Sequence, residues 1–541
     1  MTIIIRAFVL FSSLIVLTSQ VFAAPAPMAA NQQGVSLHPA STQPAQQQQP
    51  IPTLPPLPLG PAAPPPKRDS VLTMDMTNQA TALRPEFAAD IAQASAWDWY
   101  IITATLDLPN LRVYGEQRVV IENRTSTPFE TLLFHLYPNH PYFGGRLQVA
   151  NTVAVNGQPA SLSLEQNETL LRVYLPQALL PGERAMVSMQ FETFTQRNAS
   201  GSIFGAFNAE AGVWSLASFY PVLARTFNGV WDERPLHAHG DLPVNEAALH
   251  LVTLDAPPGL TLVTSGSRIS EEQLAHGPYR ERFVTGPQRE FFVAALAGLE
   301  QTQALVDGTT VTSYYRPVNA AAGQQALATA VQSVQAFHAL YGPYPFTELE
   351  VIQIALGNFD GMEFPGVILI DEGAYTEVGR RLEITVAHEI AHQWWYNVVG
   401  SDQQGQAWLD EGLATYSQVL FYEAQNNPAA AAYELQLLRG WYLSALRSGT
   451  DGVVNRYVGD FPDRYTYFVL SYAKAGLFLH ALRQQMGHDL FLAFLQRYYA
   501  TYRYQEATGD DLMTIAEATC QCDLSSLYTD WIQSSGTVAI P

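Results

Sequence analysis

The chain has 541 residues and a formal net charge of −21, and 48% of its residues are hydrophobic. A chain of this length is too long for a single hydrophobic core, so we expect two or more domains. The negative charge argues against a nucleic-acid partner, because the phosphates would be repelled. Cys520 and Cys522 are the only cysteines. They either form one small bridge or remain two thiols, and they cannot supply a disulfide framework.

Residues 1–23 have the pattern of a signal peptide for export. Arg6 supplies the positive start, residues 7–17 are apolar, and residues 21–23 are suited to cleavage. The alternative is an uncleaved membrane anchor, but the apolar run is short for a membrane span and two serines interrupt it. We therefore expect a secreted or cell-envelope (periplasmic) protein that has no stable membrane span after signal cleavage.

Residues 24–95 are predicted to be a disordered spacer. The segment is rich in Pro, Ala and Gln up to about residue 67, and one short helix is expected near residues 85–94. Such a composition cannot bury enough apolar surface to offset the entropy lost on ordering. The spacer therefore separates the signal peptide from the first folded domain.

Residues 96–297 are predicted to form an N-terminal β domain. Short runs rich in β-branched and aromatic residues, such as residues 100–106 and 117–122, alternate with turn residues. Many short strands without long helices indicate an antiparallel β-sandwich or saddle.

The β domain contains the sequence His237-Ala238-His239-Gly240-Asp241. Two histidines and an aspartate are possible ligands of a second metal ion. Pro and Gly flank the sequence and no further ligand is identifiable, which favours a polar loop near the contact between domains.

Residues 298–541 are predicted to form a mainly helical catalytic domain. Helical periodicity begins with an Ala-rich run at 320–340, which Gly342 and Pro343 end. Further helices are expected at residues 380–398 and 408–423, and more follow towards the end of the chain. Residues 348–355 and 366–370 are apolar and β-branched and are expected to be strands.

A metal site is predicted from His388-Glu389-Ile390-Ala391-His392 and Glu411. Positions four apart lie on one face of a helix, so His388 and His392 can present two imidazoles to one ion. This is the His-Glu-x-x-His pattern of zinc hydrolases, in which the adjacent glutamate reaches a water molecule. Glu411 is the strongest candidate for the third ligand. Two histidines and one glutamate leave the fourth zinc position open, as in catalytic sites.

Together with Gly361-Met362-Glu363 and Tyr472, these residues resemble the gluzincin family of aminopeptidase N and leukotriene hydrolase. Members carry a Gly-x-Met-Glu-Asn motif, then His-Glu-x-x-His, eighteen residues and Glu, then a catalytic Tyr. All counterparts occur here in this order. The first motif departs from the family, because Asp360 replaces its first Gly and Phe364 its Asn. The resemblance implies a multidomain α+β fold, with an antiparallel β-sandwich or saddle domain followed by a thermolysin-like catalytic domain.

The resemblance implies one zinc ion as cofactor and a role for each motif residue. Glu389 would be the general base that takes the proton of the attacking water. Tyr472 would donate a hydrogen bond to the developing oxyanion, although Tyr465 and Tyr467 lie nearby in the sequence. Glu363 would bind the free α-amino group of a peptide. Its neighbours Gly361 and Met362 would offer backbone groups to an extended substrate by strand addition.

These expectations lead to an exported zinc-dependent aminopeptidase that acts on peptides. Phe364 cannot supply the polar contact of an asparagine, so a zinc endopeptidase, or a hydrolase of another small substrate such as an epoxide, remains an alternative. Asp360 offers a further negative charge to the amine. A non-catalytic binding scaffold is the alternative of a different class. The intact zinc ligands, together with Glu389 and Tyr472, argue against that scaffold.

Overall fold

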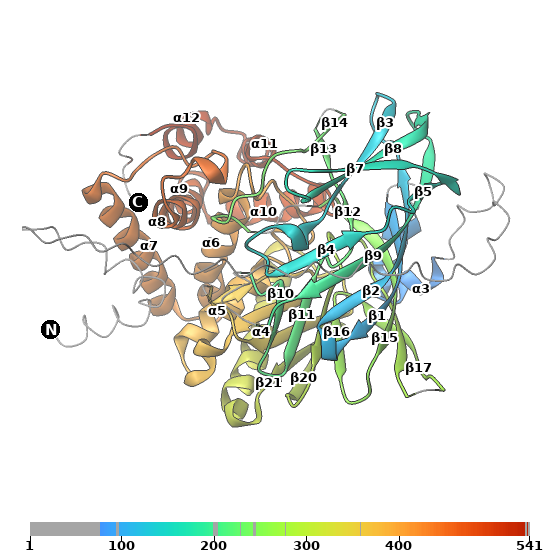
Figure 1. Ribbon diagram of the computed structural model, residues 1–541. Coiled ribbons are helices and arrows are strands. Elements are labelled where there is room, and N and C mark those ends of the chain that lie inside the picture. Colours follow the sequence, from blue (N-terminus) through green and yellow to red (C-terminus); the bar gives the residue numbers. More distant parts are fainter. Residues whose placement is uncertain are drawn as a thin grey trace, which may run out of the picture. The chain divides into compact units, whose positions relative to one another are not determined.

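The structure is a computed structural model of the chain (Figure 1). It describes residues 76–92, 97–197, 204–227, 229–241, 245–275, 277–357, 359–535 and 538. All of them belong to one compact unit, Thr73–Pro541. The predicted signal peptide and the Pro-rich part of the spacer lie outside the described residues. Among the described residues, no helix combines the length and the apolar character needed to cross a bilayer.

The last part of the predicted spacer is folded. Helix α3 (Thr77–Ala80) and a 3-10 helix (Pro85–Ala92) precede the first strand, and Phe87 and Ile91 are buried. The backbone N–H of Arg84 donates to Pro345 O at 2.9 Å. The prediction of disorder is therefore wrong for residues 76–92, because this segment packs its apolar side chains against the rest of the chain.

The strands that follow are short and numerous. They are β1 (Asp98–Asp107), β2 (Arg112–Glu122), β3 (Phe129–His135), β4 (Gly145–Val149), β5 (Ala154–Val155), β6 (Gln158–Pro159), β7 (Ser161–Glu165), β8 (Leu170–Leu179), β9 (Arg184–Thr195), β10 (Phe207–Glu210), β11 (Val213–Ala217), β12 (Val222–Leu223), β13 (Thr226–Phe227), β14 (Val230–Trp231), β15 (Ala248–Ala256), β16 (Thr261–Thr264), β17 (Ser267–Gln273), β18 (Tyr279–Val284) and β19 (Phe292–Leu296).

These strands form a nine-stranded sheet of order β17-β18-β15-β1-β2-β9-β5-β6, with β4 beside β9, two four-stranded sheets, and the two-stranded sheet β13-β14. The four-stranded sheets have the orders β10-β11-β19-β16 and β12-β3-β8-β7. Neighbouring strands are antiparallel except β1 and β15. The alternation of buried and less buried side chains along β9 is the signature of a strand with one face on the core. The predicted β domain is confirmed.

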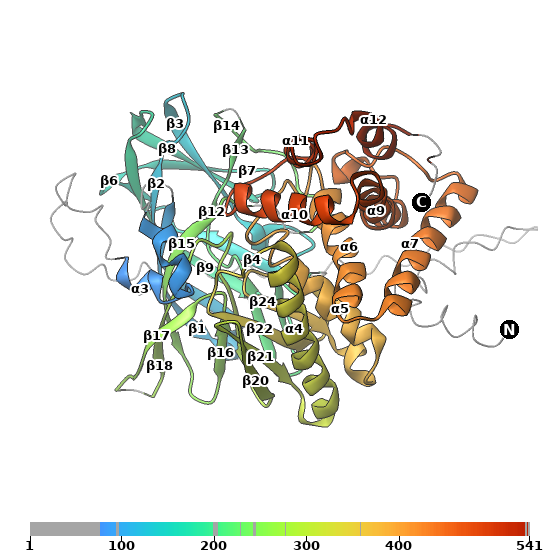
Figure 2. The same cartoon turned by 180° about the vertical axis from the view of Figure 1, so that it is seen from behind.

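The rest of the chain combines one further sheet with helices. The strands are β20 (Glu300–Val306), β21 (Thr309–Tyr315), β22 (Glu348–Ile354), β23 (Gly361–Met362) and β24 (Val367–Asp371), and the helices are α4 (Ala320–Tyr341), α5 (Arg380–Ala391), α6 (Trp408–Ala424), α7 (Pro428–Ser448), α8 (Arg464–Phe468), α9 (Ala475–Met486), α10 (His488–Tyr502), α11 (Gly509–Cys520) and α12 (Ser525–Tyr528). Figures 1 and 2 show α4 beside the five-stranded sheet and the later helices gathered beyond it.

The order of this sheet, β20-β21-β22-β24-β23, places the short strand β23 at an edge. The pairs β21–β22 and β22–β24 are parallel, and β23 runs antiparallel to β24. Helix α4 packs against β20 and β21. Gly323 allows this close packing, because a Cβ there would lie 2.0 Å from the ring of Tyr315. The fold confirms a β domain followed by a mainly helical region.

Helix α5 ends earlier than predicted, at Ala391 rather than near residue 398. The backbone of His392 is still helical, and its N–H contacts His388 O at 3.3 Å. The chain then turns, so that Trp394 and Trp395 are both buried.

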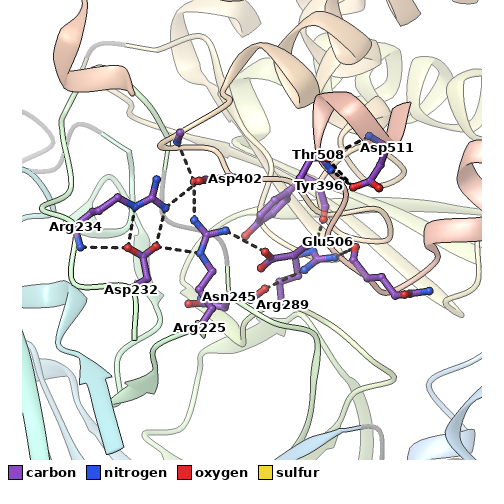
Figure 3. Close-up of polar contacts among 12 residues, drawn as sticks. Arg225, Asp232, Arg234, Asn245, Arg289, Tyr396, Asp402, Glu506, Thr508 and Asp511 are labelled. Atoms are coloured by element: carbon purple, nitrogen blue, oxygen red, sulfur yellow. Dashed lines mark hydrogen bonds and ion pairs between the residues drawn. The ribbon is translucent and has the colours of Figure 1, made fainter. Parts of the chain in front are cut away.

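One hydrophobic core extends from the β region into the sheet that carries β23. The ring of Phe364, directly after this strand, stacks on Phe292 of β19 with centroids 4.5 Å apart. Polar contacts also join the two regions (Figure 3). Arg225 is 5% exposed and binds Asp232, Asp402 and Glu506 at 3.1, 2.6 and 3.1 Å. These contacts hold the connection between α5 and α6 against the β region.

Candidate metal centre and active site

Three ligand atoms converge between helices α5 and α6. The Nε2 atoms of His388 and His392 are 3.1 Å apart. They lie 3.3 and 3.6 Å from Glu411 Oε2, which is buried and accepts no hydrogen bond from the described residues. Atoms held 2.0–2.1 Å from one tetrahedral zinc ion stand about 3.3 Å apart. The three side chains therefore fit a zinc ion, and the predicted ligands are brought together.

Neighbouring groups orient the two imidazoles. His392 Nδ1 lies 3.2 Å from the carbonyl oxygen of Trp395. Because a carbonyl oxygen only accepts, Nδ1 carries the proton and Nε2 is left as the ligand atom. The side-chain amide of Gln418, on α6, lies 2.9 Å from His388 Nδ1. The spacing of the sequence motif predicts the ligands but gives no sign of Gln418 or of the Trp395 carbonyl.

Glu389 lies beside the ligands and directly against Gly361. A Cβ at position 361 would be 2.3 Å from Glu389 Oε1. The glycine therefore leaves room for the carboxylate at the edge strand β23. Oxygen atoms of Glu363 and Glu389 and a ring nitrogen of His392 all lie within 4.8 Å of one another. The two predicted motifs, which are separate in the sequence, thus share one site.

The site concentrates buried negative charge. Burial, followed by the charge of Glu363, raises the pKa of Glu389 well above its ordinary value. Burial also raises the pKa of Glu363, against the opposing effect of His392. For Glu411 burial acts in the same direction, but contacts with His388 and His392 outweigh it and lower the pKa. Several carboxylates around two imidazoles favour binding of a cation.

Tyr472 is the tyrosine that contacts a ligand. Its hydroxyl donates to Glu411 Oε1 at 2.5 Å, and its ring stacks on His388 with centroids 6.1 Å apart. Tyr472 lies in the π-helical segment Val469–Lys474, between helices α8 and α9. Such π turns often occur at functional sites, because the extra residue redirects side chains.

The two other candidate tyrosines differ in position. Tyr467 is buried, its ring centroid is 6.0 Å from that of Tyr472, and its hydroxyl has no hydrogen-bond partner among the described residues. No hydrogen bond between described residues joins Tyr465 to the metal ligands. The geometry therefore favours Tyr472 and leaves Tyr467 in the second layer of side chains.

Glu363 is held in place by two glutamines from the segment after α5. Gln393 Nε2 donates to the carbonyl oxygens of Glu363 and Phe364 at 3.4 and 3.3 Å, and Gln393 Oε1 accepts from Gly366 N at 2.9 Å. Gln403 Nε2 donates to the Glu363 carboxylate at 3.2 Å. Sequence reasoning missed both glutamines, because neither belongs to a motif.

Asp360 and Phe364, the two departures from the family motif, do not supply extra charge or block the site. Asp360 pairs with Arg381 at 2.6 Å, so its charge is compensated and the predicted contribution to amine binding is not supported. Phe364 is 1% exposed and points into the hydrophobic core. The polar contact of the missing asparagine therefore has to come from another residue.

The described part of the chain brings no third metal-ligand atom to the histidines of residues 237–241. Among the described residues, no group of three close metal-ligand atoms includes His237 or His239. The backbone N–H of His237 donates to Gln404 Oε1 at 2.9 Å, and Asp241 O accepts from Gln404 Nε2 at 3.0 Å. The segment is a polar loop that packs against the connection between α5 and α6, in line with the polar loop favoured from the sequence.

Comparisons with known proteins find a peptidase domain in this chain. Residues 325–531 match the Peptidase family M1 domain. Aminopeptidase M1-B of Oryza sativa subsp. japonica is 27% identical over 347 residues, which are 61% of this chain and 38% of that protein. The puromycin-sensitive aminopeptidase of Caenorhabditis elegans is 28% identical over 316 residues, 55% of this chain and 33% of that protein. The chain thus spans less than half the length of these relatives.

Solved structures share the fold over nearly their whole length. An M1 zinc metallopeptidase from Deinococcus radiodurans has a TM-score of 0.60 at 19% identity, covering 82% of this chain and 94% of that chain. A variant of the Deinococcus radiodurans enzyme bound to a Tyr-Ser-Ala substrate has a TM-score of 0.59 at 18% identity, covering 82% and 95%. At this identity the likeness establishes the fold.

Proposed function

Since the chain belongs to the gluzincin family of aminopeptidase N, whose M1 peptidase domain it carries, we propose that it is a zinc-dependent aminopeptidase that removes N-terminal residues from peptides. The observation that carries this proposal is the convergence of His388, His392 and Glu411 beside two further carboxylates. One of these, Glu389, adjoins the ligands, and the other, Glu363, lies beside it at the edge of a sheet.

Zinc bound by these ligands supplies a Lewis acid and an activated water molecule. Glu389 accepts the proton of the attacking water and later passes it to the leaving amine. The hydroxyl of Tyr472 donates a hydrogen bond to the oxygen that becomes negative in the transition state.

Glu363 sets the position of the cut. Its carboxylate binds the α-ammonium group of the substrate, and this places the first peptide bond at the metal. Among the described strands β23 pairs only with β24, so an extended peptide can add to its other edge as a further strand. The side chain of Phe364 points into the hydrophobic core and therefore does not obstruct the binding of a free amine at Glu363.

We further propose that the protein is exported through the signal peptide at residues 1–23. Cys520 and Cys522 are joined in a disulfide, a bond that persists in oxidising compartments. The export proposal is tested by N-terminal sequencing of the extracellular or periplasmic protein. A mature protein that begins directly after residue 23 would support export. Retention of the intact N-terminus in the membrane fraction would indicate an anchor instead.

The enzymatic proposal is tested with aminoacyl-amide reporters and the same compounds acetylated on the amine. We expect hydrolysis of the free-amine set alone, lost with a chelator and restored by zinc. Cleavage of the acetylated set would indicate an endopeptidase. Zinc-loaded protein that cleaves neither set would contradict the aminopeptidase and would leave a different small substrate or a binding scaffold.

A further inference from the structure

The side-chain amide of Gln403 makes a hydrogen bond through its nitrogen, whereas its oxygen has no partner among the described residues. The residue lies in the connection between α5 and α6 and is 2% exposed. Its Nε2 donates to the Glu363 carboxylate at 3.2 Å. Because a carboxylate only accepts, the nitrogen is the atom that faces Glu363, and the oxygen of the same amide is left to accept from another donor. That oxygen is buried and has no hydrogen-bond partner among the described residues.

A buried acceptor without a donor is unfavourable, and native proteins rarely keep one without a reason. Here the unpaired oxygen belongs to the side chain that touches the proposed amine-binding carboxylate. An α-ammonium group has three N–H donors and a positive charge, so it can donate to more than one oxygen at once. A ligand with such a group would satisfy both Glu363 and Gln403.

We propose that the side-chain oxygen of Gln403 is the second acceptor for the α-ammonium group of the substrate, beside the carboxylate of Glu363. This inference rests on the proposed aminopeptidase function and deepens it. The role of Gln403 also explains how Phe364 can stand in place of the asparagine of the family motif. Gln403 reaches the amine-binding site from another segment, and Phe364 is then free to pack on Phe292.

The neighbours of Gln403 fix its position. Asp402 accepts from Arg225 Nη2 at 2.6 Å (Figure 3), and Gln404 exchanges hydrogen bonds with the loop of His237 and Asp241. Both partners come from the β region. Gln403 therefore stands between two anchored residues, and a side chain held in this way loses little further conformational entropy when it binds a ligand.

The test uses two zinc-binding inhibitors that differ only in the amine, leucine hydroxamate and 4-methylpentanoyl hydroxamate. Binding to the zinc-loaded full chain is measured by calorimetry, so the result does not depend on turnover. The wild type should bind the amine-bearing compound more tightly. In Gln403→Met we expect that preference to fall by about 10-fold or more, because the ammonium loses one acceptor, while the amine-free compound binds within about threefold of the wild type.

Gln403→Asn keeps an amide but shortens its reach, and it should lose the preference in the same way if Gln403→Met does not fold. Gln406→Met is the matched control. Gln406 lies in the same connection, but its Oε1 accepts from Gly509 N at 3.0 Å, so the preference should remain.

The outcomes separate the two proposals. If the wild type shows no preference for the amine, the aminopeptidase proposal is wrong. If the wild type shows the preference and both Gln403 variants retain it, or if they weaken binding of the two hydroxamates equally, the role of Gln403 is refuted while the aminopeptidase stands.

Discussion

Replacing Gly361 with alanine tests whether the placement of Glu389 controls the chemical step. The new Cβ would lie 2.3 Å from Glu389 Oε1 and 2.5 Å from its carboxyl carbon, and ordinary contact begins at 3.4 Å. The carboxylate oxygen must therefore move away by about 1.1 Å, which is the difference between 3.4 and 2.3 Å. Misplacing a catalytic group by about 1 Å costs about 10²-fold in rate. This corresponds to about 2.7 kcal/mol of transition-state stabilisation.

The assay compares kcat and KM of wild type and Gly361→Ala on a free-amine aminoacyl amide, after zinc content and the unfolding midpoint have been measured. We expect kcat to fall about 10²-fold, with zinc retained, because the metal ligands are not touched. Gly440→Ala is the control. This glycine lies in α7, and its added Cβ would meet no atom within 4 Å. A Gly361→Ala enzyme with bound zinc and near-normal kcat would refute the assignment of Glu389 as general base at this position.

Further predictions concern the base, the metal, the contact between regions and one buried acid. Glu389→Gln should keep zinc and lose turnover by about 10²- to 10⁴-fold; normal turnover would exclude the base. Chelation should lower the thermal midpoint, since bound metal at 100 times its Kd contributes about 2.7 kcal/mol, and His388→Ala should abolish that response to chelator. Arg225→Met should cost about 3 kcal/mol in denaturant unfolding, because it removes a buried cation and leaves Glu506 without its ion-pair partner, whereas Asp232 and Asp402 keep Arg234; a loss below about 1 kcal/mol would show that the Arg225 ion pairs behave as solvent-exposed ones. Burial, then the charge of Glu348, raises the pKa of Glu350 from 4.5 to about 8. The folded state thus keeps a proton that the unfolded chain releases, and wild-type stability falls as pH rises between those values. Glu350→Gln should therefore gain stability relative to wild type by about 1 kcal/mol or more from pH 5 to pH 8, and a pH-independent difference in urea midpoints would contradict the assignment.

Much of the candidate site is local in the sequence and was predictable for that reason. Two histidines four positions apart share a helix face whatever the helix packs against, so His388 and His392 are recognisable from spacing. The family resemblance then adds Glu411 and Tyr472, and both lie at the site. The strands of the β region were predictable from β-branched runs between turn residues, because side chains alternate between the two faces of a sheet.

Tertiary packing alone decided which other side chains complete the site. Gln418 and Gln403 carry no motif, and only the packing of α6 and of its preceding connection brings them to His388 and Glu363. The ends of helices were predicted less well, as at Ala391, where α5 ends several residues before the predicted boundary. The role of Phe364 also depended on packing, because its ring turns to Phe292 in the β region.

The distinction has a physical cause. Helix and strand periodicity follow from backbone geometry and can be recognised over a few residues. Contacts such as that between Gly361 and Glu389 join segments whose approach depends on the shape of the whole core. The sequence by itself therefore determined the candidate metal ligands and the class of chemistry proposed. The structure decided how the edge strand, the proposed base Glu389 and the proposed amine-binding carboxylate of Glu363 come together, because only the folded core brings β23, α5 and the connection to α6 to the same place.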